Sequence, residues 1–359
     1  MKVIDKYILK RYFGTFLGMM LLFIPISMIL DLSERIDKFI EHKVPLGEIM
    51  GYYGNFLLYF FNILFPIFLF LSVIWFTSRL AQNTEIVAML NTGMPFRRLL
   101  RPYLIGATII AITVLLLNMS IIPKARIGYN EFWVKYVRSS YYKTRQTNDV
   151  YRKIDSTHYI FASNMNHANK TAYNFVMEEV ENEQLKSKLF SDRIVWKPKK
   201  KKYELYNVRI RKYLKDREKI ITNKKMDTVF SFTLDELTPV KYIAEGLNYS
   251  DLTKFIEKEK LRGSKNIKKF ELEKYKRMSL PISAFILTFI AVAMASQKKR
   301  NGIGANLAFG IVVSMLYILF DRIFGVMVIN TGFSPFLAAW IPNIIFGVLA
   351  IFLVLRAQK

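Results

Sequence analysis

The chain has 359 residues, of which 52% are hydrophobic and 15% aromatic, and its formal net charge is +25. Because a helix needs about 20 apolar residues to cross the hydrocarbon core of a bilayer, long uncharged runs predict membrane spans. A soluble globule would have to bury six such runs in one core, so composition argues strongly against a soluble protein. The uncharged runs cover residues 13–30, 53–78, 102–123, 278–296, 303–320 and 323–355.

The first run continues into a full-length span and lacks a small-x-small cleavage site, which argues against a cleaved signal peptide. The last run is longer than one span needs, and its Ser334–Pro335 step suggests that the sixth helix begins near Phe336. The sequence therefore predicts six transmembrane helices.

The segment NTEIVAMLNTGMPFRRLLRP, residues 83–102, lies between the second and third spans. It has the pattern of a complete short helix, from about 84 to 92. Asn83 and Thr84 are residue types that cap helix N-termini, and Gly93 is placed to end the helix in a left-handed conformation.

This short helix is expected to be amphipathic. Glu85 places an acid in the first turn, where the helix dipole favours it, and Ile86, Met89 and Leu90 share one face. Such a helix suits docking into a groove on a partner protein. A helix that lies on the lipid surface is the alternative.

Orientation follows from the basic residues of short loops. The N-terminal segment, the loop at 83–102 and the loop at 298–300 are rich in Lys and Arg, whereas the loop at 31–51 is mixed in charge. The biased segments fall on one side, so both termini and the short helix are predicted to be cytoplasmic. The stretch 124–276, with a net charge of +15, is then outside.

The outer stretch is predicted to form mainly β-strands, because its segments are rich in aromatic and β-branched residues. Polar breaks separate these segments, which indicates an antiparallel sheet curled into a sandwich or open barrel. The lysines around Pro198 are interpreted as a solvated hairpin turn in preference to an anion site. The predicted strands are 158–163, 172–180, 187–196, 202–213 and 228–234.

Two helices are expected between the strands and the fourth span. Ser250 is expected to cap a helix that runs to about Leu261 and ends at Gly263, and a second helix from about Asn266 would run into the span. The outer domain would therefore be tied rigidly to a membrane helix.

No catalytic constellation is apparent. The chain has three His and no Cys, and it lacks a nucleophile elbow and a phosphate-binding loop. No catalytic residue, metal or cofactor is expected, and the chain is not expected to be an enzyme. Asp321 and Arg322, at the outer end of the fifth span, are expected to snorkel or pair.

The order of these features resembles the LptF/LptG permeases, the transmembrane subunits of the lipopolysaccharide-exporting ABC transporter. The resemblance covers essentially the whole chain, and the DRIFG segment is closer to the LptG branch. Its most specific parts are VIDKYILKRYFGTF, NTEIVAMLNTGMPFRRLLRP, KYKRMSLPISAFIL and LFDRIFGVMVINTGFSPFLAAWIPNIIFG.

The resemblance implies a membrane bundle of six transmembrane helices with an all-β periplasmic jellyroll-like domain inserted between helices 3 and 4. The implied domains are 1–123 with the first three spans, 124–249 with the jellyroll, 250–277 as a helical connection, and 278–359 with the last three spans.

The resemblance also implies partners. These are an LptF-like homologous permease, a dimer of LptB-like ATPases that binds the ATP, and LptC/LptA-like periplasmic bridge proteins; no nucleic acid is expected. In that family the loop after the second span is the coupling helix, so Glu85, Ile86, Met89 and Leu90 would contact the ATPase.

The family lines its lipid cavity with spans one and five and holds lipid A phosphates with basic residues near the outer leaflet. The candidates here are Arg35, Lys38 and Lys43, just past the first span. The family's strongest basic position lies near the end of that span, where this chain has Asp31. A solvated loop of mixed charge is the alternative.

The sequence thus predicts a subunit of the bacterial inner membrane that extracts lipopolysaccharide and passes it to a periplasmic bridge, driven by ATP hydrolysis in a partner. Two alternatives stay open. One is an ABC subunit that transmits force to an outside enzyme and moves no lipid, and the other is a membrane scaffold or sensor.

Overall fold

The computed structural model divides the chain into two compact units. The helical unit comprises Met1–Tyr129, Glu245–Leu252 and Lys268–Lys359, and the β unit comprises Asn130–Ala244 and Thr253–Ile267. The basic loop at 298–300 lies outside the described residues. The structure describes residues 3–137, 146–166, 170–181, 184–198, 200, 202–214, 217–230, 232, 243–261, 263–264, 266–297 and 302–357.

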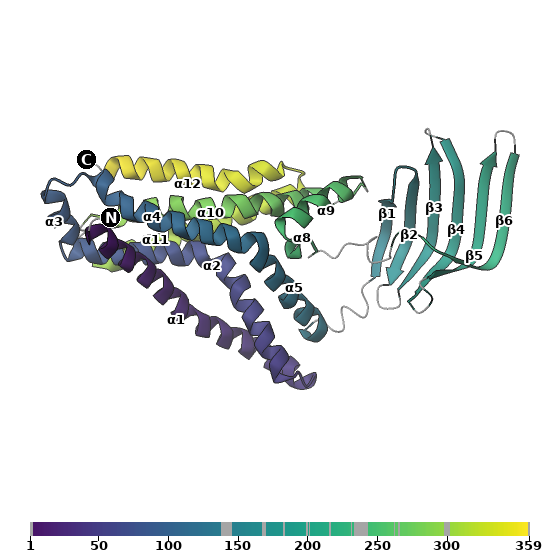
Figure 1. The fold of residues 1–359 in the computed structure, drawn as a ribbon, viewed down its shortest axis with the longest axis horizontal. Coiled ribbons are helices and arrows are strands. Elements are labelled where there is room, and N and C mark those ends of the chain that lie inside the picture. Colours follow the sequence, from purple (N-terminus) through teal and green to yellow (C-terminus); the bar gives the residue numbers. More distant parts are fainter. Residues whose placement is uncertain are drawn as a thin grey trace. The chain divides into compact units, whose positions relative to one another are not determined.

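Six helices in the described part of the chain are long and apolar enough to cross a membrane (Figure 1). The third is interrupted by a π-helical turn, η1, and continues as α5, and the fourth begins well before its apolar run. The six predicted spans are therefore confirmed as helices. They are α1 (Val3–Glu41), α2 (Leu46–Gln82), α4 (Phe96–Leu116) with η1 (Leu117–Ile121) and α5 (Ile122–Phe132), α10 (Ile267–Ala295), α11 (Gly302–Asn330) and α12 (Pro335–Ala357).

Polar side chains link neighbouring helices inside this apolar bundle. A donor in hydrocarbon has no water to bond, so it must find a partner within the protein, and such pairs fix which faces meet. Helix α2 takes part in three of the pairs. The hydrogen bonds, each 2.8 to 3.0 Å, join Tyr12–Thr288, Thr77–Tyr103, Asn62–Asn118, Ser78–Asn306 and Tyr317–Asn343.

Helices α1 and α4 approach closely at a glycine. A Cβ built on Gly106 would stand 2.9 Å from ring carbons of Tyr12, and this tyrosine is fully buried. Small residues let membrane helices approach until their side chains pack, which replaces the hydrophobic driving force that lipid does not supply.

The β unit contains one antiparallel sheet of six strands in consecutive order. Its apolar face buries Ile160, Phe175, Ile194 and Leu205 completely. This confirms an all-β domain between the third and fourth spans. The consecutive order of the described strands is that of a meander, so the jellyroll topology stays a prediction. The strands are β1 (Gln146–Lys153), β2 (His158–Asn166), β3 (Thr171–Glu181), β4 (Gln184–Lys197), β5 (Lys202–Leu214) and β6 (Arg217–Thr228).

The prediction of a strand at 228–234 is wrong for Val229, Phe230 and Phe232, which are not in a strand, and residues 231, 233 and 234 lie outside the described residues. The sixth strand lies earlier in the chain. Because β6 is polar and largely exposed, its sequence lacks the alternation of apolar and polar residues that predicts a strand. The aromatic residues after it pack on the sheet instead. Phe230 lies 5.8 Å from Phe175 between ring centroids, and the Tyr203 hydroxyl donates to the Phe232 carbonyl at 2.9 Å.

Two helices, α8 (Ile243–Gly246) and α9 (Tyr249–Leu261), precede α10. The cap of α9 is Asn248 and not Ser250, because the Asn248 side chain accepts the Asp251 N–H at 2.8 Å. Gly263, at φ +63°, follows the end of α9 as predicted. Helix α10 begins at Ile267, which confirms a helix that runs into the fourth span.

Candidate functional site

The short helix α3 (Glu85–Asn91) lies at the end of the helical unit that also holds both chain termini (Figure 1). Its bounds agree with the predicted 84–92. Gly93 adopts φ +80° and ends the helix as predicted, and its N–H donates to the Leu90 carbonyl at 3.0 Å.

The predicted side-chain cap at the start of α3 is wrong. Thr84 has a left-handed backbone, with φ 63°, and its side chain caps no N–H of the helix. This conformation directs the hydroxyl to the carbonyl of Asn83, at 2.6 Å. The Thr84 side chain therefore stabilises the turn between α2 and α3 and does not cap the helix.

The acid of α3 is held by the chain itself. The Tyr7 hydroxyl of α1 donates to Oε2 of Glu85 at 2.9 Å, and the Asn83 amide donates to Oε1 at 3.2 Å. A cavity of about 40 Å³ beside this carboxylate is also lined by Arg11 and Arg79. Glu85 therefore connects α3 to α1 in positively charged surroundings.

The predicted apolar face of α3 points inward. Ile86 is 1% exposed and belongs to the helical core, and Met89 and Leu90 pack against the same core. Val87 and Ala88 are exposed. Ile86, Met89 and Leu90 thus anchor the helix to its own chain, and their contact with a partner stays a prediction.

A bidentate ion pair holds α4 near α3. Arg98, at the start of α4, donates to both carboxylate oxygens of Asp5 in α1, at 2.7 and 2.8 Å. The pair is half-buried, and two parallel hydrogen bonds fix the orientation of both side chains. Helix α1 is therefore bonded to α3 through Tyr7 and to α4 through Asp5.

The three basic candidates past the first span lie near the other end of α1. Nε of Arg35 stands 2.7 Å from Oδ1 of Asp31, and the Tyr52 hydroxyl donates to Oδ2 of the same carboxylate at 2.9 Å. Asp31 therefore forms an ion pair with Arg35. Lys38 and Lys43 have exposed side chains.

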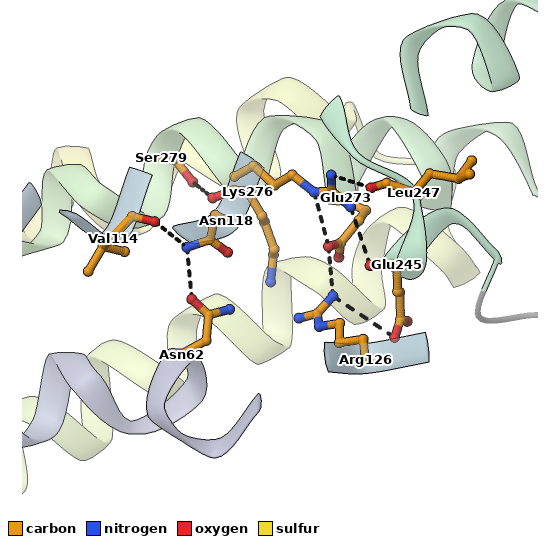
Figure 2. Close-up of polar contacts among 10 residues, drawn as sticks. Asn62, Val114, Asn118, Arg126, Glu245, Leu247, Glu273, Lys276 and Ser279 are labelled. Carbon is orange, nitrogen blue, oxygen red and sulfur yellow. Dashed lines mark hydrogen bonds and ion pairs between the residues drawn. The ribbon is translucent and has the colours of Figure 1, made fainter. Parts of the chain in front are cut away.

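A cluster of ion pairs, which sequence reasoning missed, lies deeper in the helical unit (Figure 2). Nη1 of Arg126 stands 2.7 Å from Oε1 of Glu273 and 4.0 Å from Oε2 of Glu245. Arg277 lies 3.6 Å from Glu273, and its Nη1 donates to the Leu247 carbonyl at 2.7 Å. The cluster joins α5, α8 and α10. Burial, with the neighbouring Glu273 carboxylate, raises the pKa of Glu245.

A pocket of about 220 Å³ adjoins this cluster. Lys276 lines this pocket, and its ammonium forms an ion pair with Asp321 at 2.6 Å. Asp321 was expected either to snorkel or to pair, and it is paired. Asn118, in the π-helical turn η1, donates to Asn62 in the pocket wall. Isolated π-turns inside α-helices often occur at functional sites.

The sequence held a signal for this pocket. Glu273, Lys276 and Arg277 follow one another at helical spacing directly before an apolar run, and Arg126 follows the third run. Charged side chains at the ends of spans usually extend to the membrane surface, and only the fold shows that these four lie around one pocket. Among the described residues, no group of three or more His, Asp or Glu is arranged to hold a metal ion.

Comparison with known proteins shows the family of the chain. A family described as the lipopolysaccharide export system permease LptF/LptG matches residues 6–356. The chain is 22% identical to the lipopolysaccharide export system permease protein LptG of Haemophilus influenzae, over 99% of each chain. It is 23% identical to the protein of that name in Escherichia coli K12, over 99% of this chain and 98% of the relative. The match spans nearly all of the chain, and these relatives lie in the LptG branch. The protein is therefore a member of the LptF/LptG family of lipopolysaccharide export permeases.

Proposed function

We propose that this protein is the LptG-like permease subunit that extracts lipopolysaccharide from the inner membrane and passes it to a periplasmic bridge. Its family and its full-length LptG relatives support this assignment. ATP is hydrolysed by an LptB-like partner dimer, and an LptF-like homologue completes the membrane portion. Both termini and α3 lie in the cytoplasm, and the sheet lies in the periplasm.

The energetics of the cargo require a partner that supplies work. Exposing one buried methylene to water costs about 0.8 kcal/mol, so a lipid with several acyl chains does not leave a bilayer spontaneously. A permease must therefore receive force from an ATPase and convert it into movement of its spans.

The observation that carries the proposal is the attachment of α3. Glu85 bonds to Tyr7, and Ile86 is buried in the helical core. A displacement of α3 is therefore transmitted to α1 without first being absorbed by a flexible loop. In the family, span one lines the lipid cavity, so α1 is the element that should move.

The exposed side of α3, with Val87 and Ala88, is the surface we assign to the ATPase. Glu85 then acts from the edge of the contact, where it can exchange a hydrogen bond with Tyr7 for one with the partner. Lys38 and Lys43 are the basic residues we assign to lipid A phosphates, because their side chains are exposed whereas Arg35 is half-buried.

The test is lipopolysaccharide release from proteoliposomes that contain the complete complex, measured together with ATP hydrolysis. Glu85→Lys should abolish complex assembly or the coupling of hydrolysis to release, because a third cation would join Arg11 and Arg79. Val87→Asp should weaken assembly by placing a charge in the contact. Glu257→Lys, the same charge change at an exposed position of α9, is the control.

Wild-type assembly and release in both the Glu85 and Val87 variants would remove the docking role of α3. Purification of an intact complex without any nucleotide-binding partner would instead favour the scaffold alternative. If the wild-type complex assembles and hydrolyses ATP but releases no lipopolysaccharide, the alternative of a force-transmitting subunit that moves no lipid would be favoured.

A further inference from the structure

The side of the sheet opposite its apolar face carries two exposed arginines. Arg193 is next to the buried Ile194 and Arg209 is next to the buried Val208, so both side chains point away from the apolar face. Neither guanidinium makes an ion pair with any residue that the structure describes. This outer face therefore presents two cations to a ligand from solution.

Each guanidinium is held by an aromatic ring on the facing strand. That of Arg193, in β4, lies 4.4 Å from the ring centroid of Tyr206, in β5, and that of Arg209, in β5, lies 5.0 Å from the ring centroid of Phe190, in β4. Both pairs are direct cross-strand neighbours. Because a stacked guanidinium is already oriented, it loses less conformational freedom when it binds an anion.

A row of polar side chains separates the two arginine–ring pairs. Asn174, Asp192 and Asn207 lie on the neighbouring strands β3, β4 and β5, and all three are exposed. Asn174 and Asn207 have left-handed backbones, with φ 47° and 51°, which asparagine adopts more readily than most residues. The Asn207 amide donates to Oδ2 of Asp192 at 2.8 Å. The row therefore offers amide and carboxylate groups to the hydroxyl groups of a ligand.

The spacing of the two pairs indicates a ligand with repeated charges. Phe190 and Arg193 are three residues apart on β4, and a strand rises about 3.3 Å per residue, so the pairs lie about 10 Å apart along the strands. This separation is close to the length of one disaccharide in an extended glycan, and a glycan also supplies hydroxyl groups to the polar row between. The face therefore fits a glycan with an acidic group on every second sugar.

The cargo of the proposed function is a poorer candidate for this face. In lipopolysaccharide the acyl chains are joined directly to the first sugars, and acyl chains need an apolar surface. The apolar face of the sheet lies on the side opposite Arg193 and Arg209, with the backbone of the strands between. A lipid held by its acyl chains on that face cannot place its first sugars on the outer face, so the ligand is a separate molecule.

We propose that the outer face of β3, β4 and β5 binds an acidic glycan strand of the peptidoglycan type, in which every second sugar carries carboxylates on its lactyl group or on the attached peptide. Arg193 and Arg209 bind the carboxylates, and Asn174 and Asn207 bind sugar hydroxyls. The net positive charge of the segment that contains the sheet favours the encounter.

Such binding holds the β unit against the cell-wall polymer, which a periplasmic bridge has to cross. It is a function beyond lipid export, and it requires only that the sheet lie outside the inner membrane.

The experiment measures binding of the full-length chain, purified in mild detergent, to peptidoglycan sacculi by co-sedimentation. The matched probe is the same sacculi with their carboxylates converted to amides. Wild-type protein should bind the untreated sacculi and lose most of this binding to the amidated ones, because the sugars are unchanged and only the anionic groups are removed. Added salt should weaken the binding, since exposed charges are screened.

A charge variant tests the two arginines. Arg193→Gln combined with Arg209→Gln should weaken binding to untreated sacculi about tenfold, because it removes two charged hydrogen-bond donors. The control is Lys254→Gln combined with Lys258→Gln, which removes the same charge from exposed positions of α9 in the same unit and outside the sheet. This control should bind as the wild type does.

A second variant tests the polar row. Asn174→Gly combined with Asn207→Gly removes both amides and keeps the left-handed backbone, because glycine adopts positive φ without strain. It should weaken binding to untreated sacculi and also reduce the residual binding to amidated sacculi, since the sugar hydroxyls are common to both probes. Thermal unfolding identifies any variant that fails to fold, and all four substituted side chains are exposed.

No binding to sacculi would overturn the proposal and leave an acidic protein as the occupant of this face. Equal binding to untreated and amidated sacculi, or wild-type binding by the arginine variant, would overturn it too. So would displacement from sacculi by the phosphorylated core oligosaccharide at lower concentration than by soluble muropeptides, since the face would then belong to the cargo. The assay contains no ATPase and measures no transport, so its failure leaves the proposed export function untouched.

Discussion

Single polar side chains decide which segments of this protein are held in place. Tyr7 holds the acid of α3, Asp5 holds Arg98, and Asp31 holds Arg35. The charge pattern of the sequence points to Glu85 and Arg35 as candidates, but it does not reveal that Tyr7, which is distant in the chain, is the partner of Glu85. The partner of Arg35, by contrast, is local, because Asp31 lies four residues earlier on the same helix. The ion pair with Asp31 changes the assignment of Arg35 as a phosphate ligand, because a paired guanidinium attracts a phosphate less strongly.

A pH-dependent turn in the β unit provides a test at this scale. Burial raises the pKa of Asp155, but hydrogen bonds from the Thr157 and His158 backbone N–H groups and the His158 ring outweigh it and lower the pKa to about 2. Since the folded pKa lies below the unfolded value, the carboxylate stabilises the turn above about pH 4, and this contribution is lost as pH falls toward 2.

Hydrogen exchange at the Thr157 and His158 amides should therefore lose protection between about pH 4 and 2, beyond the intrinsic change in exchange rate. Asp155→Asn should have low protection throughout and no transition in this window. Amides in the middle of β3, paired on both sides, serve as the internal reference. A wild-type turn that keeps full protection at pH 2 would contradict the assignment.

At the scale of elements, the helices were predictable and the sheet only in part. Apolar runs of sufficient length specify a span whatever their neighbours are, so all six were found. Strand β6 was missed because it is polar and held by backbone pairing with β5. The aromatic residues of the segment 228–234 predict a strand, but Phe230 and Phe232 pack on the sheet instead, and residues that cover a sheet have the same composition as a strand.

The inward face of α3 illustrates a different limit. Helical spacing correctly grouped Ile86, Met89 and Leu90 on one side, but periodicity cannot say whether an apolar stripe packs against its own chain or a partner. The close approach of α1 and α4 was also invisible, because a glycine within a span has several explanations in sequence and only the position of Tyr12 selects one.

That close approach makes a prediction about an element. Gly106→Val should force α1 and α4 apart, because a Cβ there already meets the Tyr12 ring at 2.9 Å, and such overpacking costs about 1–3 kcal/mol. Thermal unfolding of the chain in detergent should show a lower midpoint. Gly14→Ala, in α1, is the control, since a Cβ there has nothing within 4 Å. Equal midpoints for the two variants would mean that the interface yields without cost.

At the scale of the whole molecule, the proposal requires that force enters at one side of the membrane and lipid leaves at the other. Basic short loops support this orientation, with α3 inside and the sheet outside. The chain has no cysteine, so single cysteines can be introduced without background labelling. Ala88 on α3 and Lys219 on β6 are exposed in their respective units.

In cells whose outer membrane has been permeabilised, a membrane-impermeant maleimide should label Lys219→Cys at once. It should label Ala88→Cys only after the inner membrane is broken, and then more weakly when the ATPase is bound, because the partner covers that side of α3. Labelling of Ala88→Cys with the inner membrane intact would place α3 in the periplasm, where no ATP is bound. The route by which hydrolysis moves α1 would then not exist, whatever the family of the protein.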